Sequence, residues 1–369
     1  MKDLILGIGF GSESIYVTYL NSKNNSVQLV ENSTGEYRTL AYIKENSDHT
    51  FIVGTNAKKK DGIFWLRDVN QTSTFTFNES KYNIKDFCIH ILQYIKDFCQ
   101  KKFGDVLLRS VISLPIYFSK QLCSLIEECA NQVGLNVMAV INEPTAITLN
   151  YWQNNPSNSL TNLIVYDLGA RSLTISKVDI IHNILILIKS AIYSLHKGLN
   201  VWVDQQIEYF LNRAKKELAK NYQDAAINQA YLKKKIAASL ESALLSLNEK
   251  KELIVAINEP IGLNGAMPIF LPPLSEKGID KTYEIFTSPL ISLVSNPSDY
   301  TLIMAGGGSH LKSIKNQIDA LGFKEVIHFN NPEQASAMGA CWYGAIISGL
   351  IPNKLVLSLT NNVTDLNNL

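Results

Sequence analysis

Two glycine-containing segments far apart in the chain share one pattern, and this repeat constrains the fold more than any other feature. The first is Gly7-Ile-Gly-Phe-Gly-Ser-Glu-Ser-Ile-Tyr-Val17, and the second is Asp167-Leu-Gly-Ala-Arg-Ser-Leu-Thr-Ile175. Each surrounds a glycine turn with β-branched and aromatic residues, which is typical of a β-hairpin. Aligning them pairs Asp167 with Gly9, Gly169 with Gly11 and Ser172 with Ser14. The repeat indicates two related lobes, each with a glycine turn.

A third glycine loop follows later in the chain. Leu302-Ile-Met-Ala-Gly-Gly-Gly-Ser-His310 predicts a strand that opens onto a glycine loop and a helix. Because glycine has no β-carbon, the N–H groups of such loops can converge on a phosphate. Any one of the loops also matches an ordinary tight turn. Three in order point to one nucleotide held between two lobes.

Between the first two glycine loops, helices alternate with strands. Apolar residues repeat at helical spacing from Ile84 to Phe98, and strands are expected at Leu107–Leu114 and Val137–Ile141. Ser119 is a suitable N-cap for the helix between those strands. The segment Asn142-Glu-Pro-Thr145 directly follows the second strand. This alternation predicts an α/β fold.

The second half of the chain is predicted to contain two strands and two helices before an irregular region. Ile180 to Leu195 is too short to span a bilayer and is typical of two strands that turn at His182-Asn183. Helices are expected at Asp204–Lys220 and Gln229–Leu247. An irregular, proline-bearing stretch is expected to follow, through Pro273.

Composition excludes several classes of protein. The chain has 369 residues, of which 46% are hydrophobic and 18% charged, with a net charge of +1. It is large enough for two lobes, and neither disorder nor a dominant electrostatic partner is indicated. The five cysteines include no C-x-x-C pair, which argues against a disulfide framework or a zinc site. The N-terminus has no cleavable apolar segment, so a cytoplasmic protein without a membrane partner is expected.

The segment Asn142-Glu-Pro-Thr145, together with the three glycine loops, resembles the ATPase domain of the heat-shock 70-kDa chaperones. The resemblance extends from Gly7 to Gly349 and implies a two-lobed, actin-like α/β fold. It implies lobe I at 1–155, lobe II at 156–332, a return helix to lobe I at 333–350 and a linker-like tail at 351–369. Within the tail, Leu355–Leu359 resembles that family's interdomain linker, or is a weak terminal strand. No peptide-binding β-sandwich is expected.

The resemblance also implies a site for ATP or ADP with magnesium, although a cleft without nucleotide remains an alternative. Arg67, Glu143 and Asp167 correspond to catalytic positions, and Asp167 would also hold magnesium through water. The residues that correspond to nucleotide contacts are Gly9, Gly11, Ser12, Gly169, Ser172, Gly198, Ser246, Gly306, Gly307 and Gly308.

Several polar residues of that family are replaced in this chain. Gly9 stands where an aspartate would hold water on magnesium, and Arg67 stands where a lysine would position the attacking water. Glu13 replaces a threonine that faces phosphate, so its carboxylate either repels phosphate or points to solvent. Ala170 and Arg171 bring side chains to a turn that glycine normally occupies, and these side chains would narrow the pocket or supply a cation that faces the phosphates. The adenine-side helix face is also changed, at Ser239, Ser242 and Ala243. Nucleotide binding without efficient hydrolysis, a degenerate ATPase, is the expectation.

The altered loops resemble one branch of the family, the atypical 70-kDa subunit of the ribosome-associated complex. This resemblance implies a non-hydrolysing regulatory co-chaperone that assists nascent chains near the ribosome. Its partners would be a J-domain protein of the zuotin type and another 70-kDa chaperone. The alternative is an ATP-hydrolysing chaperone, whereas a sugar or acetate kinase is disfavoured by Asn142-Glu-Pro144. The lysine runs Lys58–Lys60 and Lys233–Lys235 are either solvated surface or contacts to ribosomal RNA.

Overall fold

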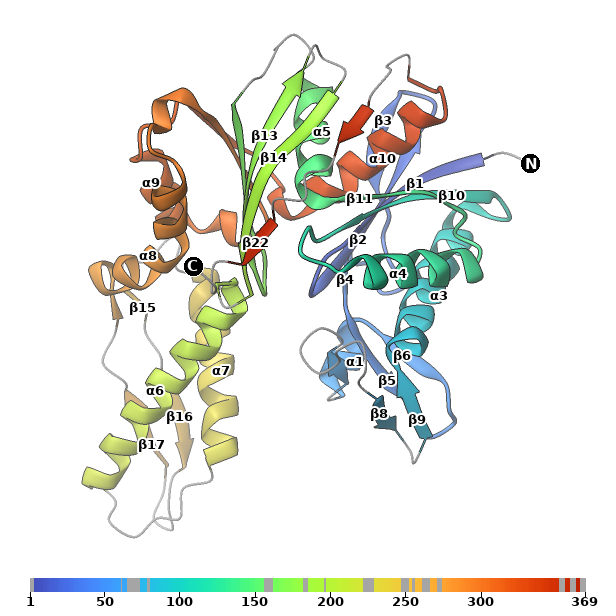
Figure 1. Ribbon diagram of the computed structural model, residues 1–369. Coiled ribbons are helices and arrows are strands. Elements are labelled where there is room, and N and C mark those ends of the chain that lie inside the picture. The colour runs from blue at the N-terminus through green and yellow to red at the C-terminus, as the bar shows by residue number, and fades with distance from the viewer. Residues whose placement is uncertain are drawn as a thin grey trace.

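The computed structural model describes residues 3–60, 62–64, 74–77, 80–155, 162–181, 185–195, 197–221, 229–246, 252–253, 256–260, 266–270, 274–351, 356–358 and 363–365. These residues form two α/β lobes, each built on its own twisted sheet (Figure 1). The expected two-lobed, actin-like α/β fold is therefore confirmed. None of the described helices is long and apolar enough to cross a membrane.

Lobe I is built on a mixed sheet in which the first glycine segment forms the hairpin of β1 and β2. The sheet has the order β11-β10-β1-β2-β3, with β4 also paired to β2. Strands β1, β10 and β11 are parallel, and the other pairings are antiparallel. The bounds are β1 Asp3–Phe10, β2 Ser14–Asn21, β3 Ser26–Leu29, β4 Arg38–Leu40, β10 Leu107–Leu114 and β11 Val137–Asn142.

Two helices cover one face of this sheet, and both begin at polar caps. The predicted helix is α3 (Ile84–Phe103), which begins with a capping box formed by Asn83 and Asp86. Helix α4 (Lys120–Gln132) begins where the side chain of Ser119 accepts a hydrogen bond from the backbone N–H of Leu122, at 3.2 Å. Buried aliphatic and aromatic side chains of α3 pack against the inner strands, so lobe I has its own core.

A smaller unit of lobe I lies beyond α3 and carries short antiparallel pairings (Figure 1). Strand β5 pairs with β6 and β7, and β8 pairs with β9. The elements are β5 Tyr42–Glu45, β6 Phe51–Val53, α1 Thr55–Lys59, β7 Ile63–Phe64, β8 Thr74–Phe77 and β9 Ser80–Asn83.

Lobe II is built on a second mixed sheet that contains the second glycine hairpin, β12 and β13. Its order is β20-β19-β12-β13-β14-β21, and β22 also pairs with β14. The two strands expected around His182-Asn183 are confirmed as β13 and β14. The bounds are β12 Leu163–Leu168, β13 Leu173–Ile181, β14 Leu185–Ser194, β19 Thr301–Ala305, β20 Glu325–His328, β21 Val356–Ser358 and β22 Val363–Asp365.

The tail of the chain adds strands to this sheet. The segment that resembles a linker contains β21, which pairs in parallel with β14, and β22 pairs with the same strand farther along. Of the two readings of Leu355–Leu359, the terminal strand is therefore the one observed for residues 356–358. The edge strand β14 offers unpaired backbone groups, which makes the addition of these short strands favourable.

The helical part of lobe II differs from expectation in two places. The first helix, α6 (Leu199–Asn221), begins before the expected Asp204, and the second is α7 (Gln229–Ser246). The stretch through Pro273 is not wholly irregular, because β15 (Glu252–Leu253) pairs with β18 (Leu274–Ser275), and β16 (Ala256–Pro260) pairs with β17 (Ala266–Phe270). Prolines are tolerated there because two-stranded ribbons consist only of edge strands. The remaining helices are α8 Glu276–Leu293 and α9 Lys312–Asp319, with short 3-10 turns η1 Pro297–Asp299, η2 Gly307–His310 and η3 Pro332–Gln334.

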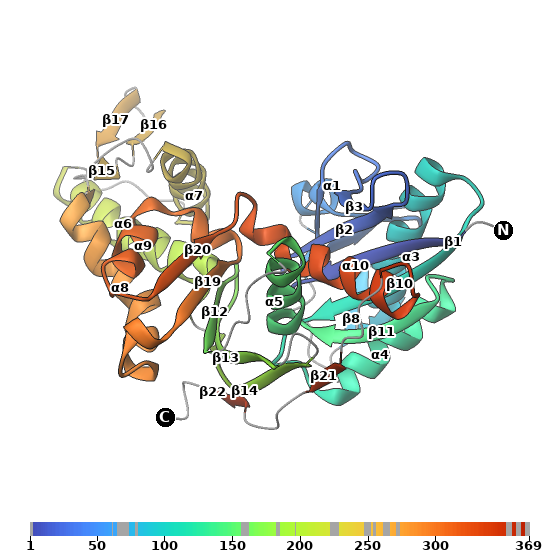
Figure 2. The ribbon, with the colours of Figure 1, turned by 90° about the horizontal axis from the view of Figure 1, so that it is seen from above.

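Helices α5 (Glu143–Asn154) and α10 (Ala335–Ile347) lie between the two sheets (Figure 2). One buried apolar cluster includes Ile5 of β1, Ile147 of α5, Val165 of β12 and Trp342 of α10. A shared core of this kind couples the lobes mechanically. The glycine loops at the ends of β1, β12 and β19 consequently face one another across the middle of the molecule (Figure 2).

Candidate functional site

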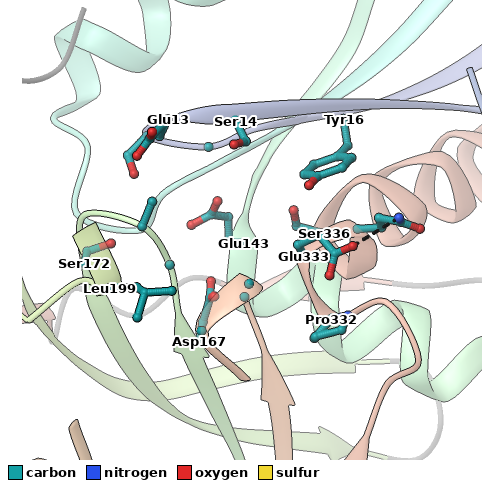
Figure 3. Close-up of a pocket in the computed structure, with 18 of the residues that line it drawn as sticks. Glu13, Ser14, Tyr16, Glu143, Asp167, Ser172, Leu199, Pro332, Glu333 and Ser336 are labelled. Atoms are coloured by element: carbon teal, nitrogen blue, oxygen red, sulfur yellow. Dashed lines mark hydrogen bonds between the residues drawn. The ribbon is translucent and has the colours of Figure 1, made fainter. Parts of the chain in front are cut away.

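The three glycine loops meet at a cavity of about 610 Å³ between the lobes (Figure 3). Lobe I contributes the β1–β2 turn from Gly11 to Ser14, and lobe II contributes the β12–β13 turn with Gly169 and Ser172. The third loop, Gly306 to Gly308, closes another side. The structure therefore brings together the loops that the sequence singled out, with Gly11, Ser12, Gly169, Ser172, Gly306, Gly307 and Gly308 on the cavity wall.

Glu143 is placed at the cavity by the start of helix α5. The side chain of Asn142 caps the helix by accepting a hydrogen bond from the backbone N–H of Thr145, at 2.9 Å, and Pro144 occupies the first turn. Strand β11 ends at Asn142, the residue that caps the helix, so α5 begins at the carboxyl end of a parallel strand. This edge is where α/β folds commonly bind their ligands.

Glu143 and Asp167 face the same space from opposite lobes (Figure 3). Burial raises the pKa of Glu143 well above its usual range, and the negative charge of Asp167 raises it further. Burial raises the pKa of Asp167 to about 6. Two carboxylates in this arrangement are costly to ionise together, and a cation between them would remove that cost.

The third loop is pressed against strand β12. Gly306 has a positive φ of 78°, and a β-carbon there would lie 2.3 Å from the carbonyl oxygen of Leu168. A β-carbon on Gly308 would lie 2.4 Å from the Leu168 side chain. Only glycine meets both demands, for conformation and for close approach. By contrast, a β-carbon on Gly307 would come no nearer than 4.0 Å to Glu333, so that glycine borders open space.

Side chains connect the two lobes across the cavity. The side-chain amide of Asn200, in α6, donates a hydrogen bond to the carboxylate of Glu13. The hydroxyl of Tyr117, in lobe I, shares a 3.1 Å hydrogen bond with the hydroxyl of Ser172, and its ring stacks on Tyr193 with centroids 5.1 Å apart. Glu13 is only 7% exposed, so the alternative that it points to solvent is wrong.

The second hairpin turn also positions the start of α6. The backbone N–H of Leu199 donates to the carbonyl of Gly169 at 3.0 Å, and that of Asn200 donates to Ala170 at 2.7 Å. Gly198 fits beneath this turn, because a β-carbon there would lie 2.2 Å from the carbonyl carbon of Arg171. Leu199 and Asn200, and not Gly198, line the cavity.

Arg171 does not line the cavity wall. Its guanidinium lies 3.8 Å from the carboxylate of Asp204, on the α6 side of the turn. Of the two side chains expected to narrow the pocket, only Ala170 lines the cavity, and Arg171 is not the phosphate-facing cation that was the alternative. Gly9 lies under α10, where a β-carbon would be 2.9 Å from the hydroxyl oxygen of Ser336. The turn reaches the cavity two residues later, at Gly11.

Two of the proposed site residues cannot be placed in the cavity. Arg67 lies outside the described residues, and so does the side chain of Ser246. The same holds for the side chains of Ser242 and Ala243, while Ser239 is half-buried. The roles assigned to Arg67 and Ser246 therefore stay predictions.

The cavity has further lining residues that no pattern in the sequence indicates. His310 lies 2.7 Å from the Glu333 carboxylate, and Tyr16 has its pKa raised to about 12 by burial and by the charge of Glu333. Glu36 and Arg38 complete the polar rim. The carboxylates on the wall (Glu13, Glu36, Glu143, Asp167 and Glu333) outnumber the basic side chains described there, which are Arg38 and His310.

This wall suits a phosphate group only together with a cation. The glycine loops can offer converging N–H groups, and the pair Glu143 and Asp167 can offer oxygen ligands or hold metal-bound water. Mg²⁺ is usually bound through one or two carboxylates, with water and phosphate supplying the other ligands. The described residues therefore fit a magnesium nucleotide at the phosphate end.

Restoring an aspartate at position 9 is expected to fail sterically. Besides Ser336, the backbone nitrogen of Ala337 would lie 3.0 Å from the new β-carbon. Gly9→Asp should therefore destabilise the protein by about 1–3 kcal/mol, as overpacking does, without producing ATP turnover. Urea unfolding measures the loss, and the double variant Gly9→Asp with Ser336→Gly should recover part of it. Full stability of the single variant would contradict the packing described.

Removing the Tyr117 hydroxyl tests the second connection between the lobes. Tyr117→Phe keeps the ring stack on Tyr193 but loses the hydrogen bond to Ser172. The expected loss is about 1 kcal/mol in the free energy of unfolding, the usual value for one hydrogen bond. Tyr37→Phe, at a tyrosine that is 46% exposed, is the matched control and should change little. Equal effects of both substitutions would show that the contact with Ser172 is unimportant.

Comparison with known proteins agrees with this geometry. Residues 63–365 match the family model described as "Hsp70 protein". The chain is 26% identical over 379 residues to the chaperone protein DnaK of Mycoplasmopsis synoviae (strain 53), covering 97% of this chain and 61% of that protein. It is 26% identical over 380 residues to DnaK of Metamycoplasma hominis, covering 97% and 62%. The chain thus spans about three-fifths of the length of these relatives. Because the family model covers residues 63–365 and the fold agrees with it, the chain belongs to the Hsp70 protein family.

Proposed function

We propose that this chain binds an adenine nucleotide with Mg²⁺ between its lobes, hydrolyses it at most slowly, and acts as a regulatory partner of a chaperone. The observation that carries the proposal is the asymmetry of the two hairpins. Strand β12 ends with the carboxylate of Asp167 on the cavity, whereas the matching position of β1 is Gly9, packed under α10. One of the two carboxylates that would surround the metal is therefore absent.

The remaining residues support binding. The turns at Gly11, Gly169 and Gly306–Gly308 would hold the phosphates, and Asp167 with Glu143 would hold metal-bound water. When bound, Mg²⁺ offsets the charge of the phosphate oxygens. The carboxylates of the chain would then be ionised at neutral pH, because the cation lowers their pKa.

Hydrolysis has weaker support. Phosphoryl transfer depends on a group that positions the attacking water and on cations around the transferred phosphate. Among the cavity-lining residues that the structure describes, none is a lysine, and the arginine Arg38 lies on the rim beside Glu36. Glu143 remains as a polar group on the cavity wall, but burial and the charge of Asp167 raise its pKa and so disfavour its ionised form. With these cavity-lining residues, we expect ATP turnover to be slow.

Calorimetric titrations with ADP and with ATP, each with and without magnesium, followed by a turnover assay with ATP on the same sample, test the proposal. We expect binding of at least ADP that requires Mg²⁺, and little or no ATP turnover. An Asp167→Asn variant should bind more weakly in magnesium, because it loses the charge that faces the metal. Rapid magnesium-dependent turnover, or no nucleotide binding at all, would contradict the proposal.

The finer role is a regulatory co-chaperone in the cytoplasm, near the ribosome, together with a J-domain protein of the zuotin type and another 70-kDa chaperone. It is supported by the resemblance of the first loop around Gly9 and of the second loop around Arg171 to that branch of the family. Sedimentation of the protein with ribosomes at physiological salt tests it. A protein that stays in the supernatant, with or without a J-domain partner, would remove the ribosome from the proposal.

An ATP-hydrolysing chaperone is the second candidate. It is favoured by the relatives that match nearly the whole of this chain, because both are named chaperone protein DnaK. The turnover assay separates the two candidates. Hydrolysis stimulated by a J-domain protein would favour the chaperone, whereas binding without turnover favours the regulatory partner.

A further inference from the structure

Glu13 occupies a distinctive place at the cavity, where the β1–β2 turn of lobe I meets α6 of lobe II (Figure 3). It is 7% exposed, and its carboxylate accepts a hydrogen bond from the side-chain amide of Asn200. Its own carbonyl accepts a hydrogen bond from the backbone N–H of Ala41, at 2.8 Å. Both the backbone and the side chain of Glu13 are therefore held in place.

Charges from both lobes act on this carboxylate. Burial raises the pKa of Glu13, and the positive charges of Lys58, Arg171 and Arg38 partly offset that effect. These basic groups come from α1, from the second hairpin and from β4. The buried carboxylate is therefore held by a hydrogen bond to lobe II and is partly compensated by basic groups of both lobes.

We propose that Glu13 is a built-in occupant of the phosphate end of the cavity, where its carboxylate joins the lobes through Asn200 and excludes the terminal phosphate of a nucleoside triphosphate. This inference rests on the proposed nucleotide site and narrows it to one class of ligand. Nucleotides with fewer phosphates, or the nucleoside alone, are the ligands that fit. The lobes are also held together without any nucleotide.

Charge and volume both support exclusion. A carboxylate and a phosphate group a few ångströms apart repel each other, and the repulsion is stronger in a partly buried cavity than in water. Glu13 also fills space next to Ser12 and Ser14, on the turn that would otherwise lie open to the phosphates. A triphosphate must therefore displace the carboxylate and break its hydrogen bond to Asn200.

The first arm of the test is calorimetric titration with adenosine, AMP, ADP and ATP in the presence of Mg²⁺. We expect the wild-type protein to bind ADP or AMP at least about tenfold more tightly than ATP. Glu13→Thr, which removes charge and volume, should raise ATP affinity at least about tenfold relative to adenosine. Glu13→Gln, which removes charge only, should give a smaller gain. Glu31→Gln, at an exposed glutamate of the same lobe that does not line the cavity, is the matched control and should leave the ratio unchanged.

The second arm needs no nucleotide. Small-angle X-ray scattering of nucleotide-free protein should show a larger radius of gyration for Asn200→Asp, which places a like charge opposite Glu13, than for wild type. Glu13→Thr should shift the radius of gyration in the same direction, and the control Glu31→Gln should leave it unchanged.

Equal affinity of the wild type for ATP and ADP, or an unchanged ATP-to-adenosine ratio in Glu13→Thr, would overturn the exclusion of triphosphate. If no variant binds any nucleotide, the proposed function fails and exclusion fails with it. The scattering result then decides the connection between the lobes independently. An unchanged radius of gyration in both Asn200→Asp and Glu13→Thr would overturn that connection.

Discussion

Gly339→Ala is expected to destabilise the protein by at least about 3 kcal/mol, the upper part of the range for overpacked cores. Helix α10 crosses α5 so closely at this residue that a β-carbon would lie 1.7 Å from the carbonyl oxygen of Ala146. Because the obstacle is backbone, no rotamer change can relieve it. The two helices would have to separate, and they carry the apolar cluster that both lobes share.

Urea unfolding followed by circular dichroism measures this loss. Gly307→Ala is the matched control, since a β-carbon there meets nothing nearer than 4.0 Å, and it should change the free energy of unfolding by less than about 1 kcal/mol. Gly339→Ala should also loosen the cavity, because Glu143 lies at the start of α5. A Gly339→Ala protein as stable as the Gly307→Ala control would refute the close packing of α5 and α10.

Features that depend on neighbouring residues in the sequence could be predicted. The helix start at Ser119 depends on a side chain that caps its own backbone within a few residues. The hairpins β1–β2 and β12–β13 depend on glycine between β-branched runs. Since the hairpin pattern recurs in both halves, it predicted two related lobes.

Features that depend on tertiary contacts could not. Glu13 and Asn200 are 187 positions apart, and nothing near either residue indicates the other. The sequence pattern predicts a start of α6 at Asp204, whereas the helix begins at Leu199. The backbone N–H groups of Leu199 and Asn200 donate to carbonyls of the second hairpin turn, and this tertiary contact leaves no local signal in the sequence. The carboxylates Glu36 and Glu333 reach the cavity from a strand-end loop and from η3, so the acidic character of its wall was not foreseen.

The second large effect is expected from Asp167→Asn, measured as a change in the pH dependence of stability without magnesium. Burial raises the pKa of Asp167 from 3.8 to about 6 in the folded protein. A carboxyl with a raised pKa stabilises the fold fully below its unfolded value, and this contribution is lost as pH rises through the folded value. Stability should therefore fall between about pH 4 and pH 7 in the wild type relative to the variant.

The size of the effect follows from the shift. Each pKa unit corresponds to about 1.4 kcal/mol, so Asp167→Asn should gain up to about 3 kcal/mol at pH 8 relative to its effect at pH 4. This is an upper value, because the residue is only half-buried and water in the cavity reaches it. The variant also removes the charge that raises the pKa of Glu143, so the two carboxyls contribute with the same sign.

Thermal unfolding in EDTA across this pH range checks the prediction. Glu208→Gln is the control of opposite sign, because the hydrogen bond and charge of Lys233 lower the pKa of Glu208, and its loss should destabilise the protein at neutral pH. Added Mg²⁺ with ADP should reduce the wild-type slope, since a cation between Glu143 and Asp167 favours their charged forms. Parallel wild-type and Asp167→Asn curves would mean that Asp167 is solvated like a surface carboxylate, and the argument for a cation at this pair would fail with it.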